Sequence, residues 1–164
     1  MAMLTSARKA AIAFGCGVLL MFPAFTAVAS DQLLEDFQYY DLPTTVSQNV
    51  AHALMEENAA IVIDVRSPEE YAEGHIAGAY NFPVETIAKH AADFQVVKDT
   101  NTPVLVYCRT GIRAASAVSA LMDMDIKHLM NMGGVSSWEY GLTTEVPTTP
   151  FADAVKAVKP YKAQ

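Results

Sequence analysis

Hydrophobic and polar positions alternate in blocks along the chain, and the blocks predict strands and helices in turn. Residues 59–65 and 104–107 are continuous apolar runs, typical of strands buried on both faces of a parallel sheet. Shorter runs at 79–83 and 128–132 predict two further strands. Apolar residues recur at helical spacing between these runs. The pattern predicts an α/β fold, a central parallel β-sheet flanked by helices on both faces.

Capping residues locate several of the predicted helices. Ser47 is an N-cap for the first helix, and Ser67 is an N-cap for a short second helix that ends at Gly74. The pair Gly133–Gly134 predicts a turn after the last strand. The other helical segments that the apolar spacing predicts are 84–94, 114–122 and 135–141.

The N-terminal segment has the three parts of a secretory signal peptide. Arg8 and Lys9 precede an apolar run over residues 10–25, and Ala-Val-Ala then precedes Ser30. We expect a signal peptide over residues 1–29, cut between Ala29 and Ser30, and therefore a periplasmic protein. Because glycines and a proline interrupt the short apolar run, we expect no stable membrane insertion after cleavage.

The rest of the sequence divides into one domain and two flanking segments. We expect an N-terminal lead-in over residues 30–44, the domain itself over 45–146, and a C-terminal tail of weak helical pattern over 147–164. Internal repeats and a second domain are not evident.

The charge of the chain restricts its partners. The formal net charge of the 164 residues is −7, from 11 Lys and Arg against 18 Asp and Glu. Loss of Arg8 and Lys9 with the signal peptide leaves nine basic residues and makes the net charge −9. A protein this acidic is not expected to bind nucleic acid or an anionic membrane surface.

The cysteine content points to one residue. Cys16 would leave with the signal peptide, so Cys108 would be the only cysteine of the mature protein. Exported proteins usually carry cysteines in pairs as disulfides. A single cysteine is an inert buried thiol, an intermolecular link or a reactive group, and its neighbours decide among these alternatives.

The neighbours of Cys108 favour a reactive thiolate. Cys108 follows the strand at 104–107, Gly111 allows a tight turn, and Arg109 and Arg113 add positive charge before the next helix. Lowering a thiol pKa from about 8.5 to about 6.5 takes roughly 2.7 kcal/mol. A helix N-terminus supplies about 0.5–2 kcal/mol and a nearby guanidinium up to about 4 kcal/mol before desolvation. The thiolate is the form of cysteine that attacks.

Three ordered motifs resemble those of the rhodanese (thiosulfate sulfurtransferase) family. CRTGIR, which starts at Cys108, is similar to the family's active-site loop. Val62–Pro83 resembles its Asp-x-Arg…Glu-[Tyr/Phe]-x-x-Gly-His-Ile-x-Gly-Ala signature, and Met132–Leu142 resembles its closing Gly-Gly…Trp…Gly motif. The resemblance covers about Val46 to Leu142.

The resemblance implies a fold, a reaction and a set of site residues. Cys108 would take the outer sulfur of thiosulfate or a similar small anionic donor, hold it as a persulfide, and pass it to cyanide or to a thiol acceptor, including a protein thiol. Asp64, Arg66 and His75 would give structural support. The substrate-binding loop would comprise Arg109, Thr110, Gly111, Ile112 and Arg113, whose backbone N–H groups would stabilise the sulfur and the departing charge.

Two other functions remain open on the same fold. One is a phosphatase or an arsenate reductase. Related phosphatases of this fold carry a seven-residue Cys-x5-Arg loop, whereas Cys108 to Arg113 is six residues, which favours sulfur transfer. A binding module that docks a partner without turnover is the other alternative.

The remaining candidate ligands do not indicate a metal or a cofactor. His52, His90 and His128 stand alone at no metal-ligand spacing, and we expect neither a metal nor a cofactor. Trp138 is expected to be a packing anchor.

Overall fold

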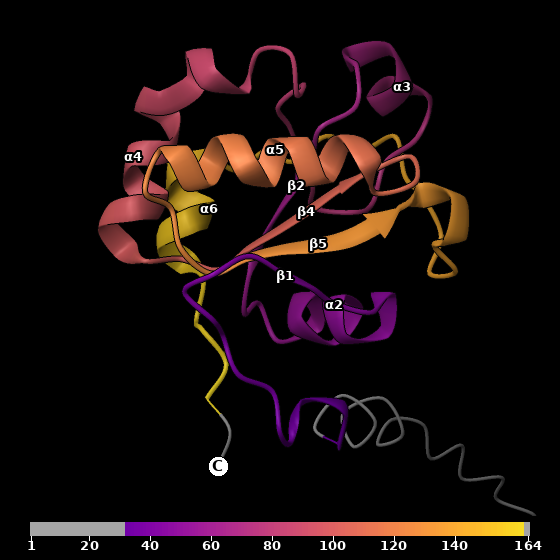
Figure 1. Ribbon diagram of the computed structural model, residues 1–164. Coiled ribbons are helices and arrows are strands. Elements are labelled where there is room, and N and C mark those ends of the chain that lie inside the picture. Colours follow the sequence, from indigo (N-terminus) through magenta and orange to yellow (C-terminus); the bar gives the residue numbers. More distant parts are fainter. Residues whose placement is uncertain (1–31, 163–164) are drawn as a thin grey trace, which may run out of the picture.

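A five-stranded parallel sheet forms the centre of the molecule (Figure 1). The computed structural model describes residues 32–162, so the predicted signal peptide lies outside the described residues and stays a prediction. The strand order is β1-β5-β4-β2-β3, and all neighbours are parallel. The strands are β1 (Thr44–Thr45), β2 (Ile61–Asp64), β3 (Tyr80–Asn81), β4 (Val104–Cys108) and β5 (Leu129–Gly134).

Helices cover both faces of this sheet, which confirms the predicted fold class (Figure 1). Helix α2 (Gln48–Glu56) lies on one face, and helix α5 (Ile112–Asp123) lies across the other together with α4 (Ala91–Thr100) and α6 (Phe151–Ala157). The shorter elements are α3 (Pro68–Glu73) and the 3₁₀ turns η1 (Ile87–His90) and η2 (Val135–Ser137). Within residues 32–162, no helix is long and apolar enough to cross a membrane.

Strand β4 shows how the apolar runs divide between the two faces. Alternate residues of a strand point to opposite faces, and Val104, Val106 and Cys108 pack in the cluster under α5. Leu105 and Tyr107 pack in the cluster under α2. Because all five residues of β4 are buried, the strand holds Cys108 firmly at its carboxyl end.

The helix predicted over residues 84–94 is wrong in its bounds. Residues 84–90 form a turn and then η1, in which Thr86 N donates to Pro83 O at 2.9 Å and Lys89 N donates to Thr86 O at 2.8 Å. Helix α4 begins at Ala91 and ends before Asn101, whose φ of 53° closes the helix in the left-handed conformation. The apolar residues keep helical spacing through both η1 and α4, so the sequence pattern did not show that one segment ends and the other begins between His90 and Ala91.

Both flanking segments pack against the domain. In the predicted lead-in, Leu34 is completely buried and Tyr39 Oη donates to Ala59 O at 2.8 Å. In the predicted tail, the Phe151 ring lies 4.9 Å from the Phe82 ring, and Val155 is 1% exposed. The weak helical pattern of the tail therefore corresponds to helix α6. The contact between the Phe151 and Phe82 rings and the burial of Val155 hold this helix against the core.

Truncation of Val155 measures how much the C-terminal segment stabilises the domain. We expect Val155→Ala to lower the free energy of unfolding by about 2 kcal/mol, because it leaves a cavity in the core. Urea denaturation gives the value, and Lys156→Ala, an exposed neighbour, should change it by less than about 0.5 kcal/mol. Equal stability of Val155→Ala and the wild type would contradict a packed C-terminal segment.

Candidate active site

Cys108 is the last residue of β4, and its sulfur lies inside a tight loop that leads into α5. The Gly111 N–H donates to the Cys108 sulfur at 3.1 Å. Gly111 has a φ of +99°, which favours glycine, and a Cβ there would lie 3.2 Å from the Cα of Gly133. Helix α5 begins at Ile112, two residues before the predicted start, so the helix N-terminus belongs to the loop itself.

The loop favours the ionised form of the Cys108 thiol. Burial alone would raise the pKa of Cys108, but backbone N–H groups that face the sulfur outweigh it, and the net shift is downward. These N–H groups belong to Ala114, Thr110, Gly111 and Arg113. The residue is 1% exposed, so the charge of the thiolate is stabilised by the loop rather than by water.

Strand β5 holds this loop through Asn131. The Asn131 Nδ2 donates to Gly111 O at 3.1 Å, and the Asn131 Oδ1 accepts from Gly133 N at 2.9 Å. One amide side chain therefore connects the turn before α5 to the end of the neighbouring strand. Sequence analysis missed Asn131, because a polar residue inside an apolar strand carries no motif of its own.

Gly134 gives the loop room to lie against β5. A Cβ at Gly134 would come within 2.2 Å of the backbone carbon of Arg109. Ser136 N donates to Arg109 O at 3.1 Å, and Gln48 Nε2 from α2 donates to Gly134 O at 2.8 Å. The turn predicted at Gly133–Gly134 is wrong, since both residues end β5 and Gly134 pairs with Cys108.

Arg113 makes a bidentate ion pair with Glu70 of α3. Its Nη1 and Nη2 donate to Glu70 Oε2 and Oε1 at 2.6 and 2.7 Å. Glu70 also completes a capping box, in which Ser67 N donates to Glu70 Oε2 at 3.2 Å and Glu70 N donates to Ser67 Oγ at 3.2 Å. The hydrogen bonds from Arg113 lower the pKa of Glu70 to about 2, and Glu70 raises the pKa of Arg113. The Arg113 charge is thus already paired.

Of the other predicted loop residues, Thr110 contributes to the site through its backbone N–H. The side chains of Arg109 and Thr110 are exposed, and Ile112 is 78% exposed. The structure brings together around the sulfur the amides of Thr110, Gly111 and Arg113, and it leaves the side chains of Arg109, Thr110 and Ile112 at the rim. Arg109 is therefore the loop guanidinium that faces solvent.

Comparison with known proteins agrees with this geometry. The family described as the rhodanese-like domain matches residues 47–140. The chain belongs to this family. The thiosulfate sulfurtransferase PspE of Escherichia coli (strain K12) is 38% identical over 73 residues, 44% of this chain and 68% of that protein. A sulfurtransferase of Allochromatium vinosum is 28% identical over 103 residues, 62% of this chain and 92% of that protein.

A solved structure supports the same assignment. The crystal structure of a rhodanese-like domain protein from Staphylococcus aureus has a TM-score of 0.54 and is 27% identical, covering 63% of this chain and 99% of that one. Together these relatives support a sulfurtransferase-like role for this rhodanese-like domain.

Asp64 and Arg66 form a buried ion pair at the carboxyl end of β2. Asp64 is 0% and Arg66 is 5% exposed. Arg66 Nη2 donates to Asp64 Oδ2 at 2.6 Å and to Gly74 O at 2.7 Å. The guanidinium also lies 5.8 Å from the ring centre of Tyr107. The pair thereby connects the end of β2 to the end of α3, the helix that carries Glu70.

His75 lies between two segments of the same rhodanese-like fold. Its ring is fully buried and stacks on Tyr71 at 3.7 Å. Its Nδ1 lies 2.9 Å from Tyr71 O, its Nε2 lies 3.0 Å from Glu145 O, and its backbone pairs with Thr143. His75 thus joins α3 to the segment after residue 142, away from the sulfur. Across residues 32–162, no group of three or more His, Cys, Asp or Glu side chains gathers as a metal site would require.

The pH dependence of stability tests the Arg113–Glu70 pair. The pKa of Glu70 falls from 4.5 to about 2 on folding, so its contribution is complete above about pH 4.5 and is lost as the pH falls through 2. We expect the free energy of unfolding of the wild type to fall more steeply between pH 5 and pH 2 than that of Glu70→Gln. Glu73→Gln, on the same helix, should keep the wild-type slope. Parallel profiles for Glu70→Gln and the wild type would contradict the pair.

Substitution of Gly134 tests the steric support of the loop. We expect Gly134→Ala to push the backbone of Arg109 away and to slow alkylation of Cys108 by iodoacetamide at neutral pH at least about tenfold, because the N–H groups no longer stabilise the thiolate. Gly141→Ala is the control, since its φ of +83° also strains alanine but no atom lies within 4 Å of its Cβ. Equal loss of reactivity in both variants would show a general loss of stability instead.

Proposed function

We propose that the protein is an exported, single-domain sulfurtransferase that carries a sulfane sulfur as a persulfide on Cys108. The observation that carries the proposal is the thiol at the end of β4, whose pKa is lowered by the backbone N–H groups of its own loop. The three-part N-terminal pattern supports export, and the relatives named as sulfurtransferases support the reaction class.

The proposed reaction needs no proton donor in the loop. The Cys108 thiolate attacks the outer sulfur of thiosulfate, the S–S bond of the donor breaks, and the electron pair leaves with sulfite. The product is a Cys108 persulfide anion, so charge is conserved. Cyanide or an acceptor thiolate then attacks the outer sulfur, which releases thiocyanate or a new persulfide and restores the thiolate.

The loop supplies what this reaction requires. The N–H groups of Thr110, Gly111 and Arg113 stabilise first the thiolate and then the anionic outer sulfur. Arg113 closes the loop, and because Glu70 already pairs with it, the attraction of a dianionic donor falls mainly to Arg109 at the exposed rim.

Mass spectrometry tests the persulfide directly. After incubation with thiosulfate, the intact protein should gain the mass of one sulfur atom, mapped to Cys108 by peptide digestion, and cyanide should remove it. Cys108→Ser should not gain this mass. An unmodified Cys108 in a folded protein would show that thiosulfate is not the donor.

The same samples separate the two alternatives. Hydrolysis of an aryl phosphate that disappears in Cys108→Ser would indicate a phosphatase despite the six-residue loop. A binding module would be indicated by two results together. Cys108 would accept no sulfur from any donor tested, and the Cys108→Ser variant would keep the cellular role of the protein.

A further inference from the structure

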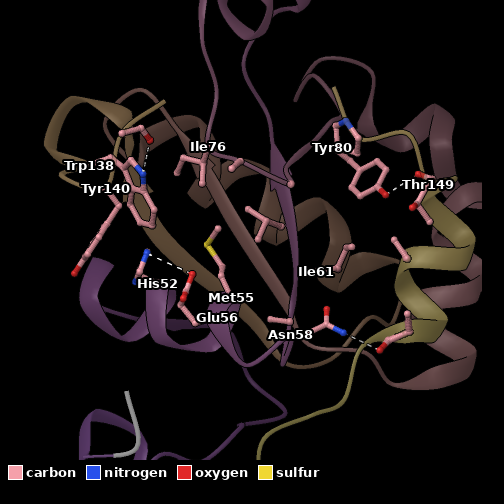
Figure 2. A pocket seen from close by; sticks show the side chains of 18 of the residues that line it. His52, Met55, Glu56, Asn58, Ile61, Ile76, Tyr80, Trp138, Tyr140 and Thr149 are labelled. Carbon is pink, nitrogen blue, oxygen red and sulfur yellow. Dashed lines mark hydrogen bonds and ion pairs between the residues drawn. The ribbon is translucent and has the colours of Figure 1, made fainter. Parts of the chain in front are cut away.

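A cavity of about 710 Å³ lies beside β2, separate from the Cys108 loop (Figure 2). Its lining falls within residues 52–157 and includes no residue of Cys108–Arg113. The volume is within the range of about 300–1,000 Å³ that is usual for ligand sites. Residues 141–157, which supply one wall, lie beyond the part of the chain that matches the rhodanese-like family. The matched domain and the segment that follows it therefore enclose the cavity together.

The floor of the cavity is an edge of the central sheet that β3 leaves unpaired, at residues that are 5–6% exposed. Strand β3 pairs with β2 only at Ile63 and Asp64, while Ala60, Ile61 and Val62 line the cavity. Ile61 N donates to Pro103 O on the β4 side at 2.9 Å. Because successive residues of a strand direct their backbone groups to opposite edges, the C=O of Ala60 and the N–H of Val62 face the cavity.

The two walls of the cavity differ in the side chains that line them. Figure 2 shows Met55, Trp138 and Glu56 on the side of α2, and Tyr80 and Thr149 on the side of α6. The α6 wall also carries two small residues, Ala154 and Ala157. Side chains of an added strand would alternate between the walls, so those on one face would contact Met55 and Trp138 and those on the other would contact Ala154 and Ala157.

The charge at the cavity favours a basic occupant. Glu56 is the one acidic residue among the lining residues, its side chain is 61% exposed, and among residues 32–162 no lysine or arginine lines the cavity. Glu56 lies 3.8 Å from His52 at the same rim. The chain as a whole has a net charge of −7, which adds to the attraction of a positive side chain.

We propose that this cavity binds a short, extended and basic peptide segment of a partner protein, which adds a strand to the free edge of β2. Main-chain hydrogen bonds to Ala60 and Val62 hold the segment, and a lysine or arginine side chain lies near Glu56. The three uncovered residues span about 10 Å, so three or four peptide residues fill the edge. The proposal does not depend on sulfur transfer.

The fluorescence of Trp138 reports binding, because it is the only tryptophan of the chain. The probe is acetyl-Lys-Ala-Val-Ala-Lys-amide, which alternates large and small side chains and contains no aromatic residue. We expect a saturable change in Trp138 fluorescence with a midpoint below about 5 mM. The same peptide with its three central residues N-methylated should not bind, since it lacks the N–H groups that pair with the edge.

Variants on both walls locate the bound peptide. Glu56→Lys should raise the midpoint about fivefold or more, whereas Glu57→Lys, the same charge change one residue away and outside the lining, should leave it unchanged. Ala157→Leu should block binding, whereas Ala152→Leu on the same helix should not. Circular dichroism checks that each variant is folded.

Three results would overturn the proposal. Equal binding of the N-methylated peptide would exclude strand addition. An equal effect of Glu56→Lys and Glu57→Lys would show unspecific attraction to an acidic protein. The same fluorescence change with lysine amide alone would assign the cavity to a small cation instead of a peptide.

Discussion

The rest of the site depends on the hydrogen bond from the Gly111 N–H to the Cys108 sulfur, because the loop must keep this donor close to the sulfur. A sulfur this deeply buried would stay protonated on grounds of desolvation, and only donors held close to it reverse that preference. The donors are backbone amides, so they reach the sulfur only if the chain curls tightly. That curl requires a positive φ at Gly111 and leaves Thr110 and Ile112 exposed, so the loop cannot hold itself by burying its own side chains.

Two neighbouring elements hold the loop by different physical means. On the β5 side, the Asn131 amide binds the Gly111 carbonyl, and the missing side chain of Gly134 lets the Arg109 backbone approach. On the α3 side, Glu70 holds Arg113 by two hydrogen bonds of an ion pair. Because Glu70 pairs with the Arg113 guanidinium, the fixed backbone dipoles of the loop are the main groups that lower the pKa of Cys108, and the guanidinium adds to their effect. Such dipoles are already oriented before a substrate arrives, so they need no rearrangement during the reaction.

The sequence predicted the features that depend on residues close together in the chain, and it did not predict those that depend on residues far apart. Features that depend on neighbours in sequence are found where they were predicted. These are the buried strands β2 and β4, the N-cap at Ser67 and the position of Cys108 at the end of β4. The pair between Arg113 and Glu70 joins residues 43 apart, and in the sequence Glu70 is only one of two acidic residues in the first turn of a short helix. The bounds of α4 and the packing of α6 likewise depend on contacts between distant segments. The functional residues that were missed are those whose partner lies on another element.

The shortness of β3 connects the loop to the rest of the fold. With two residues, β3 covers only the carboxyl half of β2, so the chain between β2 and β3 is free to form α3 at the carboxyl end of the sheet. That placement brings Glu70 to Arg113 and allows Arg66 to tie α3 back to Asp64. The same two-residue strand leaves Ala60–Val62 without a strand partner on the side away from β4, and the segment after residue 140 lines this edge. The segment from β2 to β3 therefore does two things: it carries Glu70 to the reactive loop, and it ends in a strand too short to pair with the first half of β2.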